Sequence, residues 1–184
     1  MSAYFALFVA VLSRLLPSMF HMTGLGFTAV GGGLLFFGAR RSRSQAAIAT
    51  LALMATDFYL TTYVYHYAFR PSHYLVTWGW YAAVCLMGHQ ILGKKSSFAR
   101  VTVAVLASTT SFFVLSNLAV WAQSTLYAHT LAGLATCYVA AIPFYANDVI
   151  STAMTAGAFF GLPALAADIV ATWRSNQTNT QSAA

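Results

Sequence analysis

Acidic residues are almost absent from this chain, which has three aspartates and no glutamate in 184 residues. Charged residues make up 7% of the sequence, whereas a soluble domain carries roughly a quarter. Hydrophobic residues make up 59%, and they occur in long runs separated by short polar breaks. Several runs approach the roughly 20 apolar residues that a helix needs to cross a bilayer core. The composition therefore excludes an ordinary soluble domain and predicts an integral membrane protein.

Signatures of catalysis and of metal binding are also missing. No glycine-rich nucleotide loop follows a strand pattern, no Ser-His-Asp spacing occurs, and no glutamate is present to act as an acid. The five histidines show no HxxxH or HExxH spacing, so a metal site would need residues that only the tertiary fold brings together. Cys85 and Cys137 lie inside apolar runs, which favours two small buried side chains over a disulfide. We predict a protein that is not an enzyme, with no cofactor and no metal.

The apolar runs are continuous and rich in Ala, Leu, Met and Gly, which predicts an all-α transmembrane bundle rather than a barrel of short alternating strands. Seven helical segments are expected, at 3–16, 22–39, 45–68, 72–93, 98–121, 128–145 and 147–172. Together they form one domain over residues 1–173. The polar residues 174–184 are expected to be a disordered tail.

Most of the net charge of +6 comes from two clusters at the ends of apolar runs, Arg40–Arg43 and Lys94–Arg100. Such positions are typical of cytoplasmic anchors, so we expect membrane topology rather than nucleic-acid binding. Both clusters would then face the cytoplasm, and the connections at 66–73 and 122–128 would face the other side.

A few ionisable residues lie inside the apolar runs, where a charge costs at least ~2.5–3.5 kcal/mol. Asp57 lies in the middle of the third segment and Arg14 in the first, while Asp148 and Asp168 lie in or beside the last. Arg14 with Asp57 or with Asp148 is the expected compensating pair. The pair either fixes the register of the helices or holds a polar ligand.

Aromatic and histidine residues gather where the third segment meets the fourth. They are Tyr63, Tyr65, His66, Tyr67, His73, Tyr74, Trp78, Trp80 and Tyr81. An aromatic belt at the membrane surface explains most of them. Belt residues should however be spread around a bundle, so part of this group is a candidate for the lining of a ligand mouth.

Pro143 is expected to end a helix, because proline disfavours a helical residue before it and removes one backbone donor. Asn147 or Asp148 would then cap the final helix, whose positive N-terminal end would face an opening. An ordinary capped hairpin is the alternative. In the preceding hairpin, Asn117 is expected to bond across to the facing helix.

Three stretches carry a resemblance to a known family. The first contains Arg14-Leu15-Leu16-Pro17, Thr23, Gly26 and Phe36-Phe37-Gly38-Ala39, with Ser18, Met19 and His21 departing from the family's pattern. The second contains Ser111-Phe112-Phe113, Asn117, Trp121, Tyr127, Thr130, Gly133-Leu134, Cys137-Tyr138, Ala141-Ile142-Pro143-Phe144 and Asn147. The third is Asp57 followed by Tyr65 and His66. The chain thereby resembles small bacterial membrane transport proteins related to the substrate-binding (S) components of energy-coupling-factor (ECF) vitamin transporters.

This resemblance implies a bundle of six spanning helices in the bacterial cytoplasmic membrane, with a cavity for a small solute such as a vitamin. Candidate ligand-binding residues are Arg14, His21, Asp57, Tyr65, His66, Asn117, Trp121, Asn147 and Asp148. The pair Ala6 and Ala10 fits the A-x-x-x-A face through which S components dock on a coupling subunit that works with ATPases, although internal helix packing explains the same spacing. A distant relative carries cobalamin, for which Cys85 would be the cobalt ligand or simply a packing residue. The alternative function is that of an accessory subunit in a larger membrane complex.

Overall fold

The computed structural model describes residues 2–19 and 27–182, except for the side chains of 17–19, 168 and 174–182. The candidate His21 therefore lies outside the described residues. The α-helices are α1 (Ala3–Met19), α2 (Val30–Arg40), α3 (Ala46–Tyr59), α4 (Leu75–Leu92), α5 (Phe98–Gln123), α6 (Leu131–Ala156) and α7 (Leu162–Ser182). Short 3-10 helices η1 (Arg43–Gln45) and η3 (Pro71–His73) and π-helices η2 (Leu60–Val64) and η4 (Gly157–Gly161) complete the elements. No strand occurs in the described part of the chain, which confirms the all-α prediction.

Three helical runs are long and apolar enough to cross a membrane, namely Arg43–Val64, Phe98–Gln123 and Leu131–Trp173. They indicate a membrane protein, as the composition predicts. The other helices are shorter, since the apolar part of α1 covers Ala3–Leu16 and α2 has 11 residues. A span needs roughly 20 residues, so the expected count of six spans stays a prediction.

The expected break at Pro143 is wrong, because α6 continues through this proline as far as Ala156. Proline is tolerated inside a membrane helix when neighbouring helices and side chains satisfy the backbone group that it leaves free. The interruption comes instead at the π-helix η4, and α7 follows it directly. Asn147 and Asp148 therefore lie within α6 and do not cap a helix.

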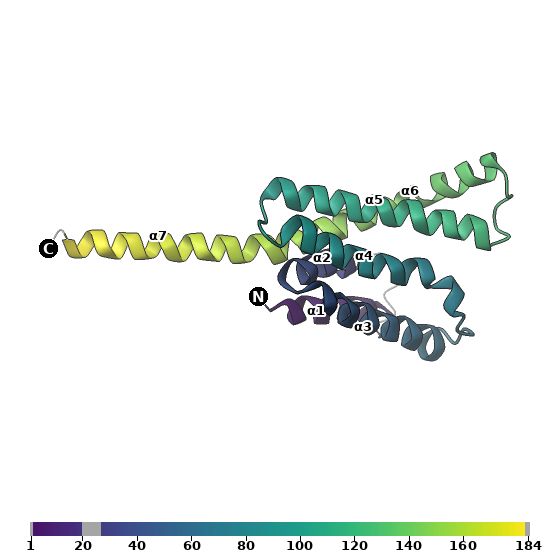
Figure 1. Cartoon of the computed structure of the whole chain (residues 1–184), viewed down its shortest axis with the longest axis horizontal. Helices are drawn as coiled ribbons and strands as arrows, with labels where there is room; N and C mark the ends of the chain where they lie inside the picture. The colour runs from purple at the N-terminus through teal and green to yellow at the C-terminus, as the bar shows by residue number, and fades with distance from the viewer. Residues whose placement is uncertain (1, 20–26, 183–184) are drawn as a thin grey trace.

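The polar segment at the C-terminus also differs from expectation. The helix α7 runs through Ser182, so the backbone of residues 174–182, within the segment predicted to be disordered, is helical. No proline or glycine follows Pro163, and the helix meets no residue that would break it. In Figure 1 this helix extends away from the other six.

The central element of the bundle is α2, in which every residue from Val30 to Ala39 is buried. Its closest neighbour is α4, and glycines allow the two backbones to approach. A Cβ atom on Gly38 would overlap the carbonyl group of Cys85, and one on Gly88 would overlap that of Leu35. Without a hydrophobic drive between helices in lipid, such close packing is a main source of association.

The first helix packs on α2 through the pair of small residues that was a candidate docking face. Ala6 and Ala10 are both fully buried, and a Cβ atom on Gly33 would lie 3.1 Å from the Ala10 side chain and 3.1 Å from the Ala6 carbonyl oxygen. The prediction that this pair docks a coupling subunit is therefore wrong. The spacing serves intramolecular packing, which was the alternative explanation.

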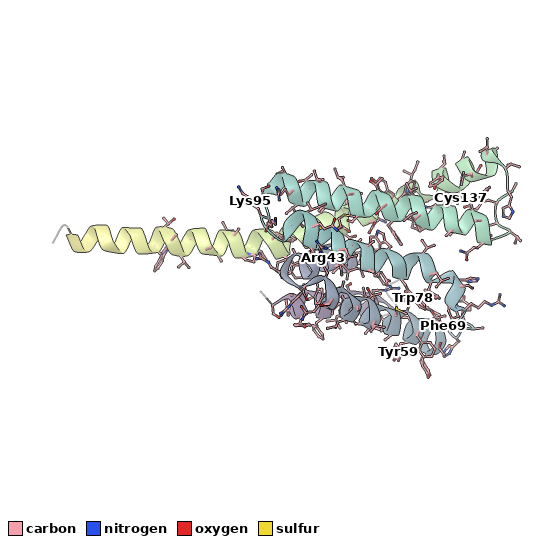
Figure 2. The ribbon with its side chains drawn as sticks, viewed as in Figure 1. Arg43, Tyr59, Phe69, Trp78, Lys95 and Cys137 are labelled. Atoms are coloured by element: carbon pink, nitrogen blue, oxygen red, sulfur yellow. The ribbon has the colours of Figure 1, made fainter. Side chains whose placement is uncertain are left out.

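The two ends of the bundle differ in chemistry. Figure 2 shows Arg43 and Lys95 at one end, while Tyr59, Phe69 and Trp78 lie toward the opposite end. This arrangement agrees with the expectation that both basic clusters share one side of the membrane. The connection from η2 to α4, residues 65–74, is called the aromatic loop below, and it lies at the end of the bundle away from the basic clusters.

Candidate functional site

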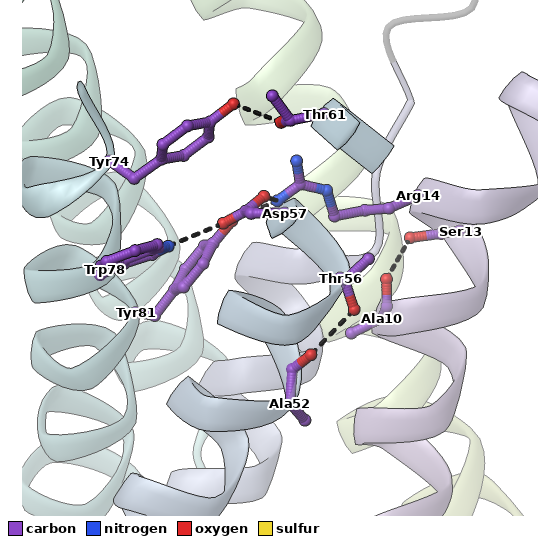
Figure 3. Close-up of polar contacts among 10 residues, drawn as sticks. All are labelled: Ala10, Ser13, Arg14, Ala52, Thr56, Asp57, Thr61, Tyr74, Trp78 and Tyr81. Carbon is purple, nitrogen blue, oxygen red and sulfur yellow. Dashed lines mark hydrogen bonds and ion pairs between the residues drawn. The ribbon is translucent and has the colours of Figure 1, made fainter. Parts of the chain in front are cut away.

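An ion pair joins α1 to α3 in the interior of the bundle. Arg14 Nη1 lies 2.7 Å from Asp57 Oδ1, and Asp57 is 1% exposed. The second oxygen of Asp57 accepts hydrogen bonds from Trp78 Nε1 at 3.0 Å and from the Tyr81 hydroxyl at 3.3 Å. Arg14 also donates to the Tyr81 hydroxyl, and Figure 3 shows the four side chains converging from three helices. The predicted pairing of Asp57 with Arg14 is confirmed.

The α-helix that carries Asp57 becomes a π-helix less than one turn after this residue. The π-helix η2 begins at Leu60, and π-turns are frequent at functional sites. Thr61, one turn after Asp57, shares a hydrogen bond of 2.5 Å with the Tyr74 hydroxyl. The wide turn and this bond connect the end of α3 to the start of α4 beside the ion pair.

A cavity of about 300 Å³ opens beside the ion pair. It is lined by Arg14, Thr28, Val30, Gly31, Asp57, Tyr74, Thr77, Trp80, Tyr81, Phe112 and Asp148. Six helices, α1 to α6, contribute, and aromatic rings form much of the wall. Tyr74 and Thr77 belong to the start of α4, so the cavity lies toward the end that carries the aromatic loop.

Asp148 brings a second carboxylate to this cavity from α6. Thr152 donates to its Oδ1 at 3.5 Å, and its Oδ2 is buried without a hydrogen-bond partner in the described part of the chain. A buried polar oxygen without a partner is costly, so such an atom needs an explanation. The lining thus holds one guanidinium, which is already paired with Asp57, and one carboxylate with a free oxygen.

A smaller cavity of about 170 Å³ lies between α5 and α6 and shares Phe112 and Asp148 with the first. Asn117 lines it, as a candidate ligand residue should. Its side chain, however, donates to the Phe113 carbonyl oxygen of its own helix at 2.7 Å. The expected bond from this side chain to the facing helix is wrong, and the contact across the interface comes from the Cys137 thiol to the Asn117 carbonyl oxygen at 3.5 Å.

Trp121 is not brought to either of these cavities. Its indole Nε1 donates to the Ala128 carbonyl oxygen at 2.9 Å, and its ring meets the edge of His129. Thr130 caps the next helix by accepting from the backbone N–H of Gly133. These residues hold the loop between α5 and α6, which is a structural role.

The remaining candidates are exposed and line none of the described cavities. His66 has a φ of 56°, and the N–H of Tyr67 bonds to the Thr61 carbonyl oxygen across it. This is the left-handed residue that commonly terminates a helix, so the backbone explains its position. Tyr65 and Asn147 are exposed as well, so the structure gives none of the three a ligand contact.

The aromatic cluster contributes more than a belt, because Tyr74, Trp80 and Tyr81 line the main cavity. The sequence analysis missed four lining residues, Thr28, Val30, Gly31 and Thr77, and of these Thr77 could have been found. Residues three or four apart share a helix face, so the spacing from Tyr74 through Thr77 to Tyr81 is the signal that identifies it. Within the described residues, no three His, Cys, Asp or Glu side chains converge in a way that could hold a metal ion.

The comparisons with known proteins place the chain in a family without assigning a function. The chain matches a family of unknown function, DUF6580, over residues 1–174, and it belongs to that family. No curated protein and no solved structure matches it. The resemblance to ECF S components therefore stays a prediction. The cavity beside the Arg14–Asp57 pair is the feature that bears on function.

Proposed function

We propose that this protein binds a small solute in the cavity lined by α1 to α6, as the binding step of membrane transport. The observation that carries the proposal is Asp148, which lines a cavity beside the Arg14–Asp57 pair and has one buried oxygen without a hydrogen-bond partner among the described residues. A ligand that donates a hydrogen bond there would satisfy a group that the protein leaves without a partner. Aromatic walls with a few placed polar groups are typical of small-molecule sites.

The charges favour a ligand with an ammonium group or other strong donors. Arg14 and Asp57 neutralise each other, so Asp148 leaves the lining with one excess negative charge. Tyr74, Trp80 and Tyr81 present aromatic rings, which attract cations through their faces. A zwitterion is also suited, because the partly exposed Arg14 can meet a carboxylate while Asp148 meets the amine.

The size of the cavity narrows the choice further. A volume of about 300 Å³ is at the lower end of the roughly 300–1,000 Å³ that is typical of ligand pockets. Cobalamin, with its corrin ring and nucleotide loop, is much larger than this space. A compact amine-bearing vitamin or metabolite is the better match, and Cys85 is a packing residue of the α2–α4 contact rather than a cobalt ligand.

In this proposal the protein lies in the bacterial cytoplasmic membrane with its basic end toward the cytoplasm, as the distribution of Arg and Lys favours. Uptake would need an energised partner such as an ECF coupling subunit with ATPases. Such a subunit would contact an exposed face, because Ala6 and Ala10 are buried. On α1 the exposed apolar residues include Phe5 and Phe8.

The second candidate function is an accessory subunit of a larger membrane complex. The four-residue network around Asp57 favours it, because that network by itself is enough to fix three helices in register. Under this function the cavity has no ligand, and changes to Asp148 alter stability alone.

Ligand binding by the purified protein separates the two functions. Mass spectrometry of small molecules that co-purify in detergent identifies a ligand, and titration calorimetry measures its affinity for wild type and for Asp148→Asn. Loss of one charge-assisted hydrogen bond should weaken binding roughly 10–100-fold. The neighbouring Asn147→Ala, which alters an exposed residue outside the cavity, should leave binding unchanged. Equal affinity of wild type and Asp148→Asn would refute the proposed role of this carboxylate.

A further inference from the structure

Another cavity, with a charge opposite to that of the proposed solute site, lies at the basic end of the bundle. Its volume is about 560 Å³, and it is lined by Ala39, Arg40, Arg41, Ser42, Arg43, His89, Gln90, Gly93 and Lys94. The connection from α2 to α3 forms one wall and the end of α4 forms the other. No residue is shared between this lining and that of the Asp57 cavity, so the two sites are separate.

Four cations face this cavity, and none of the carboxylates that the structure describes lines it. Of the three aspartates in the chain, Asp57 and Asp148 belong to the other cavity. The only ion pair among the described residues is the one between Arg14 and Asp57. The positive charge of this cavity is therefore not neutralised by a described residue, and an anion from outside the chain would be attracted to it.

Several of the basic side chains are held in place rather than free in solvent. The guanidinium of Arg41 lies 4.5 Å from the centre of the Tyr4 ring, and that of Arg40 lies 5.4 Å from the centre of the Phe36 ring. His89 Nδ1 donates to the Arg41 carbonyl oxygen at 3.0 Å, which fixes the connection after α2. The Nε atom of Arg41 is buried without a hydrogen-bond partner among the described residues. Neighbouring arginine and lysine side chains suit a phosphate group, because its oxygens accept several charge-assisted hydrogen bonds at once.

The position of the cavity favours a lipid as the source of that phosphate. Clusters of Arg and Lys at the cytoplasmic end of membrane helices attract anionic headgroups, and basic pockets between such helices bind them. Beyond the loop that follows α4, a largely apolar cavity of about 440 Å³ is lined by α5, α6 and η4, beginning at Ser96 and Phe98. The same loop contributes Gly93 and Lys94 to the basic cavity. One loop therefore lines both the basic cavity and the apolar cavity, which suits the headgroup and the acyl chain of one lipid molecule.

We propose that the basic cavity binds the phosphate group of an anionic phospholipid from the cytoplasmic leaflet. This proposal does not depend on the solute site, because the two cavities share no residue. Bound there, the lipid would link the α2–α3 connection to the end of α4 and stabilise this end of the bundle.

The test uses the full chain in detergent, with native mass spectrometry to count bound lipids and thermal unfolding to measure their effect. Phosphatidylglycerol is the anionic probe, phosphatidylcholine the zwitterionic probe and inorganic phosphate the soluble one. Wild type is expected to bind phosphatidylglycerol in preference to phosphatidylcholine and to unfold at a higher temperature with it. Inorganic phosphate at the same concentration should neither stabilise the protein nor displace the lipid.

The decisive variant is Arg43→Gln with Lys94→Gln, because both side chains are exposed and their loss should leave the packing intact. Each cation near an anionic surface contributes about fivefold in affinity, so the double variant should bind phosphatidylglycerol roughly 25-fold more weakly. The matched control is Arg70→Gln with Lys95→Gln, which removes the same charge from positions that do not line the cavity. A normal melting temperature without lipid shows that each variant is folded.

Three outcomes would overturn the proposal. Equal loss of binding in the variant and in its matched control would indicate diffuse surface attraction rather than a site. Wild type without a preference for phosphatidylglycerol would exclude an anionic lipid. Displacement of the lipid by an equal concentration of inorganic phosphate would identify a site for a soluble anion. Loss of binding in the variant alone supports the proposal.

Discussion

Replacing Arg14 with Gln leaves Asp57, the most buried charge among the described residues, without its counterion. Asp57 is 1% exposed, and Arg14 is its only cationic neighbour among the described residues. Trp78 and Tyr81 would still donate to one of its oxygens, but a neutral donor does not compensate a full charge. Removing one partner of a buried ion pair costs about 3–5 kcal/mol. For a chain of this size that corresponds to a fall in melting temperature of roughly 6–20 °C.

The reverse change, Asp57→Asn, should cost less. The amide oxygen still accepts from Trp78 and Tyr81, and the orphaned Arg14 is 24% exposed, so it can reach water in the cavity. An uncompensated donor of this kind costs about 1–3 kcal/mol. The double variant should lose less than the sum of the two single losses, because each substitution removes the charge that the other leaves unpaired.

The assay is thermal unfolding of the purified protein in one detergent, at one scan rate, for wild type, both single variants and the double variant. Arg70→Gln serves as the control, since this arginine is exposed in the loop before α4. If Arg14→Gln melts within about 2 °C of wild type, the pair contributes little to stability and the argument from burial is refuted. Losses in the double variant that add up to the sum of the single ones would show that the two groups do not interact.

Two further changes test the packing. Gly38→Ala should destabilise the protein by about 1–3 kcal/mol or more, because its new methyl group overlaps the Cys85 carbonyl group. In Gly79→Ala the new methyl group meets open space, so this variant should stabilise α4 by up to about 1 kcal/mol. Similar melting temperatures for these two variants would contradict the close approach of α2 and α4. Trp121→Phe removes the hydrogen bond to the Ala128 carbonyl oxygen and should cost about 1 kcal/mol. Hydrogen exchange should then quicken in the loop between α5 and α6, and unchanged exchange there would indicate that this bond does not hold the loop.

Much of the architecture is predictable from the sequence because a membrane restricts what a chain can do. Continuous apolar runs with few charges leave helices as the main option, and the expected segments from 3–16 to 98–121 correspond to α1 through α5. The pairing of Arg14 with Asp57 was predictable for the same reason, since a charge in lipid needs a partner inside the protein.

Other features depend on neighbours that a local pattern does not contain. Pro143 has the same local preference whether a helix stops there or continues, and the packing around α6 lets it continue. The spacing of Ala6 and Ala10 suits an internal contact and an external one equally. Only the position of Gly33 on the neighbouring helix shows that the contact is internal.

The sequence by itself determined that the chain is helical, that it belongs in a membrane, and that Asp57 in the middle of an apolar run needs a partner, because these follow from the energetics of transferring side chains and backbone into lipid. Which groups share a cavity is a different kind of question. Asp148 is 91 positions from Asp57 in the chain, and only the packing of α6 against α2 and α5 brings both carboxylates to one space. Tertiary structure alone decided this arrangement, because contacts between distant residues depend on how helices cross and not on the local order of side chains.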